Sequence, residues 1–428
     1  MKLSSDLLYF APNETSHDLP PALLPPSPRL WWTSRSFGGH AGPYVILFIS
    51  IMKLLMISGD RSVLQGKLGA FFYTLQEMRK HWERIDIICP HVPDSTVTMS
   101  ESGHRFIAGS HEGGEVFFHA CPKSLLFQIP WIINRGKALI RQHKHEVMTV
   151  HDYAPFYNGI GAKRLHTQTK VPYATEIHHI VGWPVAASIS ERFGRLMSWL
   201  FLPFVVRKAK AIRVVNYSVE RKLISWGVPR KKIWNISSFY LDADMLSPKH
   251  KPPVSYDVSF CGRLVANKGL GELIDAVATL DSIRLLIIGD GPERKRMEDK
   301  VAELHIGNRV TFLGWLPTQE AVSGAIQTAR IFVMCSKSEG GPRVALEAMG
   351  CGMPVIVTKV GVMPEVVRDD VNGVFTTGKS SDLAAKIEHL LKNEKKRDSL
   401  GHEAKKVLDT YERSRLIKQY AEFLKGLA

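Results

Sequence analysis

Short apolar runs alternate with longer segments of helical periodicity along most of this chain, and this alternation restricts the possible folds more than any other feature. Strands that are apolar on both faces are typical of parallel sheets covered by helices on each side. The pattern therefore predicts an α/β fold with parallel sheets. The twelve candidate strands are 53–58, 85–89, 116–119, 147–151, 173–178, 211–215, 258–261, 284–288, 310–313, 331–335, 355–358 and 373–376.

The chain has 428 residues, more than the roughly 250 to 300 residues at which one hydrophobic core stops growing. A polar segment with Pro248, Pro252 and Pro253 separates the first six candidate strands from the last six, so we place a domain boundary there. We expect an N-terminal Rossmann-like domain, 52–250, and a C-terminal one, 251–405. The rest of the chain, 406–428, has helical spacing without a strand, and we expect it to pack back toward the N-terminal domain.

The first 51 residues differ from the rest of the chain. Prolines cluster between positions 20 and 28 without helical or strand periodicity, which predicts a poorly structured extension. The apolar run that begins at Tyr44 is shorter than a membrane-spanning helix requires and continues into the first candidate strand. Met52 lies within this run, and one hypothesis is that the functional protein starts there.

Positive charge is concentrated in the middle of the chain. The formal net charge is +15, and residues 51–250 hold 27 basic and 15 acidic side chains, which is +12. Such a surface attracts phosphate groups or anionic lipid. The basic residues are not interleaved with the aromatic motif of an RNA-binding sheet, so we expect no nucleic acid as a partner. Five cysteines without a C-x-x-C pair favour a reducing, cytoplasmic location.

A segment from Arg192 to Lys208 is apolar in its middle and basic at both ends. Two interpretations remain open at this point. The segment is either a buried helix of the N-terminal domain or a helix that docks on an anionic membrane surface, which would place the protein peripherally on the inner face of the plasma membrane.

The most specific signal for function is the segment SEGGPRVALEAMGCGMPV, which begins at Ser338. Glu339 and Glu347 lie eight positions apart, and a Gly-Gly-Pro turn after a candidate strand leads into a helix that carries Glu347 about two turns from its start. Such glycines let backbone N–H groups approach a ligand, and the helix N-terminus points into the same cleft. The segment resembles the E-x7-E motif of family 4 retaining glycosyltransferases. That family has the GT-B fold, in which two Rossmann-like domains face a central cleft.

Three preceding segments occur in the order that the family implies. The first, from Phe260 to Gly269, is similar to its G-R-L-x-x-x-K-G motif; the second, from Ile287 to Glu293, to its G-x-G-P turn; and the third, from Arg309 to Trp315, to the strand beside the nucleobase. Beyond the E-x7-E segment, the family commonly has two adjacent glycines. Here Gly361 is present but Val362 replaces the second glycine, so this loop departs from the family pattern.

The resemblance is weaker in the N-terminal half. A glycine turn after the first candidate strand is similar to the family's loop beside donor phosphate and acceptor, and it supplies Gly66, Lys67 and Gly69. His178 resembles the histidine that faces the transferred sugar, with His179 as the alternative. The preceding strand ends in a His-Asp pair, at 151–152, which could also face the cleft.

The resemblance implies transfer of a hexose-type sugar from a UDP- or GDP-sugar to a glycan or lipid-linked acceptor, with retention at the anomeric carbon. Such reactions occur in the synthesis of cell-envelope polysaccharides and glycolipids. The implied catalytic residues are Glu339, His178, Arg263 and Lys268. The implied donor-binding residues are Gly262, Arg263, Lys268, Gly289, Gly291, Val310, Glu339, Gly340, Gly341, Pro342, Arg343, Val344 and Glu347.

We expect no metal ion and no cofactor beyond the donor. Asp242 and Asp244 have the D-x-D spacing of a metal-binding pair, but they fall in the connection between the domains. Two alternatives stay open: a sugar-nucleotide epimerase of the same fold, and a non-catalytic subunit that binds nucleotide sugar. The donor base, the acceptor and the oligomeric state are left open by the sequence.

Overall fold

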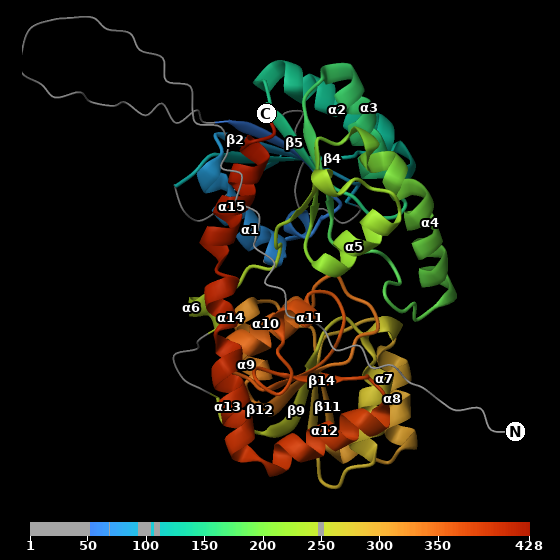
Figure 1. Ribbon diagram of the computed structural model, residues 1–428, viewed down its shortest axis with the longest axis vertical. Helices are drawn as coiled ribbons and strands as arrows, with labels where there is room; N and C mark the ends of the chain where they lie inside the picture. Colours follow the sequence, from blue (N-terminus) through green and yellow to red (C-terminus); the bar gives the residue numbers. More distant parts are fainter. Residues whose placement is uncertain (1–51, 68, 93–103, 107–111, 247–251) are drawn as a thin grey trace, which may run out of the picture. The chain divides into compact units, whose positions relative to one another are not determined.

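The computed structural model describes residues 52–67, 69–92, 104–106, 112–246 and 252–428. The proposed extension, 1–51, and the proposed boundary at 250–251 lie outside these residues. The described chain forms two sheets, each with helices around it (Figure 1). We call the eight-stranded sheet with its helices the N-terminal domain and the six-stranded sheet with its helices the C-terminal domain.

The N-terminal sheet has the order β3-β4-β2-β1-β5-β6-β7-β8, and all its neighbours are parallel except β3 and β4. Its strands are β1 (Lys53–Ile57), β2 (Arg84–Cys89), β3 (His104–Phe106), β4 (Glu115–Ala120), β5 (Val147–His151), β6 (Tyr173–Ile177), β7 (Ala211–Val214) and β8 (Ile233–Asn235). The six strands predicted in this half are confirmed. β3 and β8, which have three residues each, were not predicted.

Helices cover the N-terminal sheet on both faces, as its apolar strands predicted. Along β1, Leu54 and Met56 pack with side chains of α1 and the C-terminal helix, whereas Leu55 and Ile57 pack with α2 and α3. Successive strand residues point to opposite faces, so β1 must be apolar throughout. The helices that follow these strands are α1 (Ala70–Met78), α2 (Gln128–His143), α3 (Tyr157–Thr169), α4 (Ile189–Val205), α5 (Tyr217–Ser225) and α6 (Ala243–Leu246).

The C-terminal sheet is entirely parallel, with the order β11-β10-β9-β12-β13-β14. Its strands are β9 (Tyr256–Cys261), β10 (Leu285–Ile288), β11 (Val310–Gly314), β12 (Ala329–Met334), β13 (Val355–Thr358) and β14 (Val374–Thr376), so the six predictions for this half are also confirmed. Its helices are α7 (Leu270–Ala278), α8 (Arg294–Glu303), α9 (Gln319–Ile326), α10 (Arg343–Gly350), α11 (Met363–Val366), α12 (Ser380–Lys392) and α13 (Glu394–Lys405).

The last two helices are α14 (Val407–Thr410) and α15 (Arg413–Lys425), and α15 packs on α1 and β5 of the N-terminal domain (Figure 1). Leu416, Ile417 and Tyr420 on α15 belong to the same apolar core as Leu54 of β1. At the chain end, the Lys210 ammonium donates to the backbone oxygen of Leu427 at 2.6 Å. The C-terminal helix is therefore a structural part of the domain that is built first along the chain.

Candidate active site

A cavity of about 600 Å³ lies at the carboxyl ends of β9 and β10 and is also lined by the loop after β1. This is a typical volume for a small-molecule site, and the carboxyl edge of a parallel sheet is the typical place for one. The cavity is lined by Asp60, Ser62, Lys67, Gly69, Ala70, Phe71, Tyr73, Cys261, Gly262, Arg263, Ile288, Gly289, Asp290, Trp315, Leu316, Pro317, Thr318, Gln319, Val322, Arg343, Val344 and Glu347.

Three cations line the cavity, and one of them, Arg343, pairs with the Glu347 carboxylate. The side chains of Lys67 and Arg263 are exposed in it, and neither has an ion-pair or hydrogen-bond partner within the described parts of the chain. The neighbouring carboxylates are already engaged: Asp60 accepts a hydrogen bond from the Ser62 amide at 2.8 Å, and Asp290 pairs with Arg294 at 3.2 Å. The unshared positive charge suits an anionic ligand such as a phosphate group.

Glu347 lies at the wall of the cavity and is only 5% exposed. Its Oε1 atom accepts hydrogen bonds from Arg343 Nε at 2.8 Å and from Gln319 Nε2 at 3.0 Å. Burial raises the pKa of Glu347, and the Arg343 charge opposes that rise. Because α10 begins at Arg343, Glu347 is the fifth helical residue, a little more than one turn from the start; the expectation of two turns was wrong.

Lys268 and Glu339 form an ion pair with each other beside the cavity, although neither lines it. Ser336 also donates to Glu339, at 2.9 Å. The Lys268 side chain lies close to Gly262, because a Cβ built there would sit 3.8 Å from Lys268 Cε. The implied catalytic pair is thus adjacent to the cavity, and Glu339 already balances the charge of Lys268.

The glycine pair of the motif is packed against the N-terminal domain. A Cβ on Gly340 would lie 2.1 Å from the backbone oxygen of His178, and a Cβ on Gly341 would lie 1.7 Å from the Phe239 ring. Asn216 Nδ2 donates to the Gly340 oxygen at 2.5 Å. Neither glycine has a positive φ, so the need for glycine here is one of space and not of backbone conformation.

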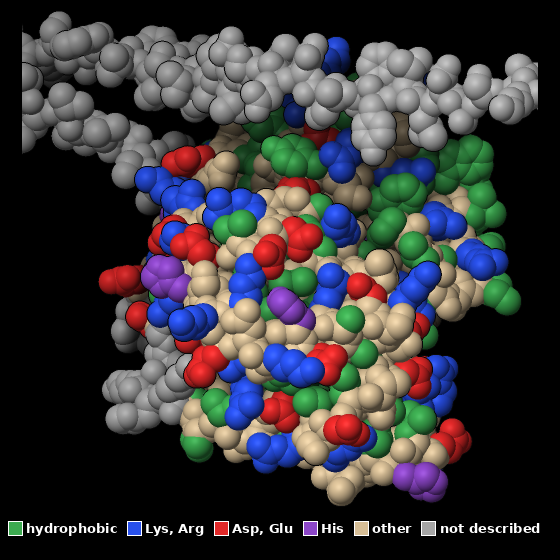
Figure 2. All heavy atoms as spheres, turned by 60° about the horizontal axis from the view of Figure 1, so that its bottom comes forward, with side chains coloured by type: hydrophobic (Ala, Val, Ile, Leu, Met, Phe, Trp, Pro, Cys, Tyr) green, Lys and Arg blue, Asp and Glu red, His purple; other side chains and the backbone are tan. Residues whose placement is uncertain are grey.

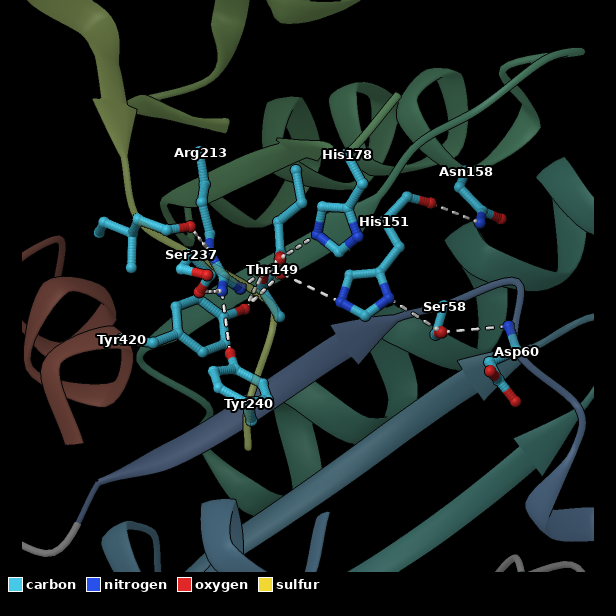
Figure 3. A network of polar contacts seen from close by, with 12 residues as sticks. Ser58, Asp60, Thr149, His151, Asn158, His178, Arg213, Ser237, Tyr240 and Tyr420 are labelled. Atoms are coloured by element: carbon cyan, nitrogen blue, oxygen red, sulfur yellow. Dashed lines mark hydrogen bonds and ion pairs between the residues drawn. The ribbon is translucent and has the colours of Figure 1, made fainter. Parts of the chain in front are cut away.

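His178 belongs to a buried polar network centred on Glu176 (Figure 3). Glu176 on β6 is 1% exposed, and its two oxygens contact five side chains. The partners of Oε2 are Arg213 at 2.6 Å and His178 Nε2 at 3.1 Å. The partners of Oε1 are Thr149 at 2.5 Å, His151 Nε2 at 3.1 Å and the Tyr420 hydroxyl.

The protonation of this network follows from its contacts. Burial alone would raise the pKa of Glu176, but His151 and Arg213 outweigh burial and hold the pKa well below its usual value. An ionised carboxylate can only accept hydrogen bonds, so both histidines must carry a proton on Nε2. Nδ1 of His151 is within 3.2 Å of the Ser58 hydroxyl. Glu176 therefore fixes the orientation of the His178 ring by accepting a hydrogen bond from its Nε2.

The implied site residues divide into two groups. Eight of them line the cavity: Lys67, Gly69, Gly262, Arg263, Gly289, Arg343, Val344 and Glu347. Those that do not line it are Gly66, His178, Lys268, Gly291, Val310, Glu339, Gly340, Gly341 and Pro342.

Val310 and Gly291 have structural positions that explain their absence from the cavity. Val310 pairs with Leu285 at the amino ends of β11 and β10, the sheet edge opposite the cavity. A Cβ on Gly291 would lie 2.4 Å from the Leu264 oxygen, so this glycine permits a close turn. Asp242, from the rejected metal pair, forms an ion pair with Arg413 at 2.9 Å.

Sequence reasoning missed several cavity residues that follow strand ends directly. Asp60 and Ser62 come after β1, and the segment from Trp315 to Gln319 comes after β11; of these, only Trp315 falls in a motif named from the sequence, the strand beside the nucleobase. Trp315 is 61% exposed although it is a large aromatic residue. The signal was its place just beyond the carboxyl end of a candidate strand, where ligand contacts of parallel sheets gather.

Solved structures with the same arrangement of two sheets define the fold class. Sucrose-phosphate synthase from Thermosynechococcus elongatus is 19% identical with a TM-score of 0.73, covering 88% of this chain and 99% of that one. HepE from Anabaena, crystallised with UDP and glucose, is 20% identical with a TM-score of 0.68, covering 88% of this chain and all of that one. The protein has the GT-B fold.

Residues 246–407 match the family model of glycosyl transferases group 1. Over longer stretches, the chain is 24% identical to N-acetyl-alpha-D-glucosaminyl L-malate synthase of Bacillus anthracis across 382 residues, 79% of this chain and 95% of that protein. It is 25% identical to the sulfoquinovosyl transferase of Arabidopsis thaliana across 388 residues, 86% of this chain and 70% of that protein. The part of the chain that holds the E-x7-E segment is therefore similar to the group 1 glycosyl transferases.

Proposed function

We propose that this enzyme transfers a hexose-type sugar, with retention of anomeric configuration, from a UDP- or GDP-sugar to a glycan or lipid-linked acceptor of cell-envelope polysaccharide or glycolipid synthesis. The observation that carries the proposal is the pair of unshared cations, Lys67 and Arg263, in a cavity that also holds the Glu347 carboxylate. A nucleoside diphosphate has anionic oxygens for the cations and ribose hydroxyls for the carboxylate. HepE, a structural neighbour, has been crystallised with UDP-glucose.

In the proposed donor complex, Arg263 and Lys67 contact the diphosphate and Glu347 accepts hydrogen bonds from the ribose. Lys268 reaches the diphosphate while it remains beside Glu339, its ion-pair partner. Glu339 is then available to the hydroxyls of the donor sugar. Glu176 holds the His178 ring at Nε2, and Nδ1 of His178 contacts the donor sugar.

The reaction we propose is a substitution on one face of the anomeric carbon. The bond from that carbon to the diphosphate oxygen breaks, and a bond to the acceptor oxygen forms on the same side. The acceptor's proton passes to the departing phosphate oxygen. Fixed cations stabilise the charge that develops on the diphosphate, and closure of the site keeps water from the oxocarbenium-like state. The proposed chemistry uses no cofactor beyond the donor.

Binding of UDP and GDP to purified wild-type enzyme and variants, measured by calorimetry, tests the donor site. One charge-assisted hydrogen bond contributes about 1.5–3 kcal/mol, so Arg263→Gln is expected to weaken nucleotide binding about 10- to 100-fold. Lys395→Gln serves as the matched control, because Lys395 is exposed and does not line the cavity. Equal affinity of Arg263→Gln and wild type for both nucleotides would contradict the assignment.

The reaction class needs a second measurement, made by NMR of the sugar product. Transfer with the donor's anomeric configuration supports the proposal, and inversion contradicts retention. Incubation with donor alone separates the alternatives: an epimerised nucleotide sugar indicates an epimerase, whereas binding without turnover on any acceptor indicates a non-catalytic subunit.

A further inference from the structure

The outer face of α4 is unusual because its exposed side is apolar. Its buried residues, Ser198, Leu202 and Val205, pack toward the N-terminal domain. Large apolar side chains on the helix are instead 38–84% exposed: Ile189, Phe193, Leu196, Trp199, Leu200, Phe201 and Phe204. A helix that only covered a core would show the reverse pattern. The interpretation as a wholly buried helix is therefore wrong.

Five of these side chains form one stripe. Ile189, Phe193, Leu196, Leu200 and Phe204 follow steps of three and four residues, which places them on a single helical face. At 100° per residue, that face lies opposite the buried residues of α4. Figure 1 shows α4 at the right-hand edge of the N-terminal domain, and Figure 2 shows hydrophobic side chains gathered beside Lys and Arg at the corresponding edge.

Cations border the stripe at both ends. Arg192 is exposed near the start of α4, and Arg207 and Lys208 are exposed just after its end. Lys163 of α3 lies over the Phe204 ring, 3.2 Å from the centroid. Burial, together with the charges of Arg207 and Lys208, lowers the pKa of Lys163, as expected for three neighbouring cations.

Among the residues that the structure describes, no acidic side chain forms an ion pair with Arg192, Arg207, Lys208 or Lys163. From Ile189 to Lys208 the sequence has one acidic residue, Glu191. Its carboxylate is engaged at the helix start, where it accepts a hydrogen bond from the Ala187 amide at 2.7 Å. The face therefore combines a row of large apolar side chains with unopposed positive charge at its borders.

We propose that the outer face of α4 docks on an anionic lipid bilayer, with the apolar stripe inserted at the interface and Arg192, Arg207, Lys208 and Lys163 against lipid phosphates. Apolar insertion bordered by cations is how helices lie in a membrane interface. Within the described part of the chain, none of the helices is long and apolar enough to cross a membrane. The inference does not depend on the proposed reaction.

Co-sedimentation of the full chain with vesicles of phosphatidylcholine, with and without phosphatidylserine, tests the proposal at low and high salt. Wild type is expected to sediment with phosphatidylserine vesicles at low salt. The triple variant Arg192→Gln, Arg207→Gln, Lys208→Gln should partition roughly 100-fold less, since each interfacial cation contributes about a fivefold factor. The variant Ile189→Ser, Phe193→Ser, Leu200→Ser should lose binding at every salt concentration.

The matched control places serine at Val254, Leu304 and Val371, which are 37–47% exposed in the C-terminal domain. It should bind vesicles as wild type does, and circular dichroism should show that all variants are folded. Unchanged vesicle binding by the stripe variant would overturn the proposal. A different result would identify a second copy of this chain as the partner. In that case sedimentation velocity shows a dimer for wild type and a monomer for the stripe variant, and neither protein binds vesicles.

Discussion

Replacement of Glu176 by glutamine is expected to destabilise the N-terminal domain far more than the loss of one ordinary hydrogen bond. Glu176 is 1% exposed and Arg213 is 2% exposed, so the charge of Arg213 has no access to water when Glu176 becomes neutral. Removing one partner of a buried ion pair costs about 3–5 kcal/mol. The glutamine side chain also has one oxygen fewer to accept hydrogen bonds. Its NH2 group must point at donors on one side, either Arg213 and His178 or the set Thr149, Tyr420 and His151.

Urea unfolding followed by circular dichroism measures this effect. With a slope of roughly 3 kcal/mol per molar urea, the expected midpoint shift is about 1–1.7 M. Asp275→Asn is the matched control: it neutralises a carboxylate that is 40% exposed and pairs with Lys300, and such surface pairs contribute about 0–1 kcal/mol.

A double-mutant cycle separates the ion pair from the rest of the network. If Glu176 and Arg213 compensate each other's charge, Glu176→Gln combined with Arg213→Met should destabilise less than the sum of the two single changes. Strict additivity, or a midpoint for Glu176→Gln equal to that of Asp275→Asn, would refute the reasoning. In vesicle-free activity assays, Glu176→Gln should also lower turnover by misorienting His178.

Two further predictions concern other buried positions. Burial raises the pKa of Asp152 to about 7, so the stability that its protonated form contributes is lost as pH rises from about 4 to about 7. Asp152→Asn should therefore raise the melting temperature at pH 8 and leave it unchanged near pH 4. Equal melting temperatures of the variant and wild type at pH 8 would contradict this prediction. The effect is at most about 4 kcal/mol. Gly341→Ala should lower the free energy of unfolding by about 1–3 kcal/mol, because the added Cβ clashes with Phe239. Gly324→Ala is the control: it has open space around it and should leave stability unchanged or raise it. Equal melting temperatures of the two variants would exclude the clash.

The strands could be predicted because each apolar run that marks one lies within a few consecutive residues. Twelve strands were found from apolar runs, and the two that were missed have three residues each. Arg263 and Glu347 were named from motifs that follow strands, and both line the cavity. Val310 was named from the same kind of motif but lies at the opposite strand end, since a motif identifies a strand and not which end of it meets a ligand.

Two features could not be predicted because they depend on distant parts of the chain. The Tyr420 hydroxyl contacts Glu176 across a separation of 244 residues, and no spacing rule connects them. For α4, periodicity indicates an apolar stripe but not whether anything covers it. The exposed fractions of Phe193 and Leu200, 60% and 50%, decide that question.

The contact between α15 and the N-terminal sheet has a consequence for biosynthesis. Tyr420 is made 244 residues after Glu176, yet its hydroxyl is a partner of that buried carboxylate on β6. Chains are made from the N-terminus, and domains generally fold in that order. Here the N-terminal domain, whose strands are made before those of the C-terminal domain, must wait until Tyr420 has been made to satisfy Glu176. The C-terminal domain, whose strands all lie between Tyr256 and Thr376, has its complete sheet sooner. Of these two domains, the one whose strands are made first is therefore completed last.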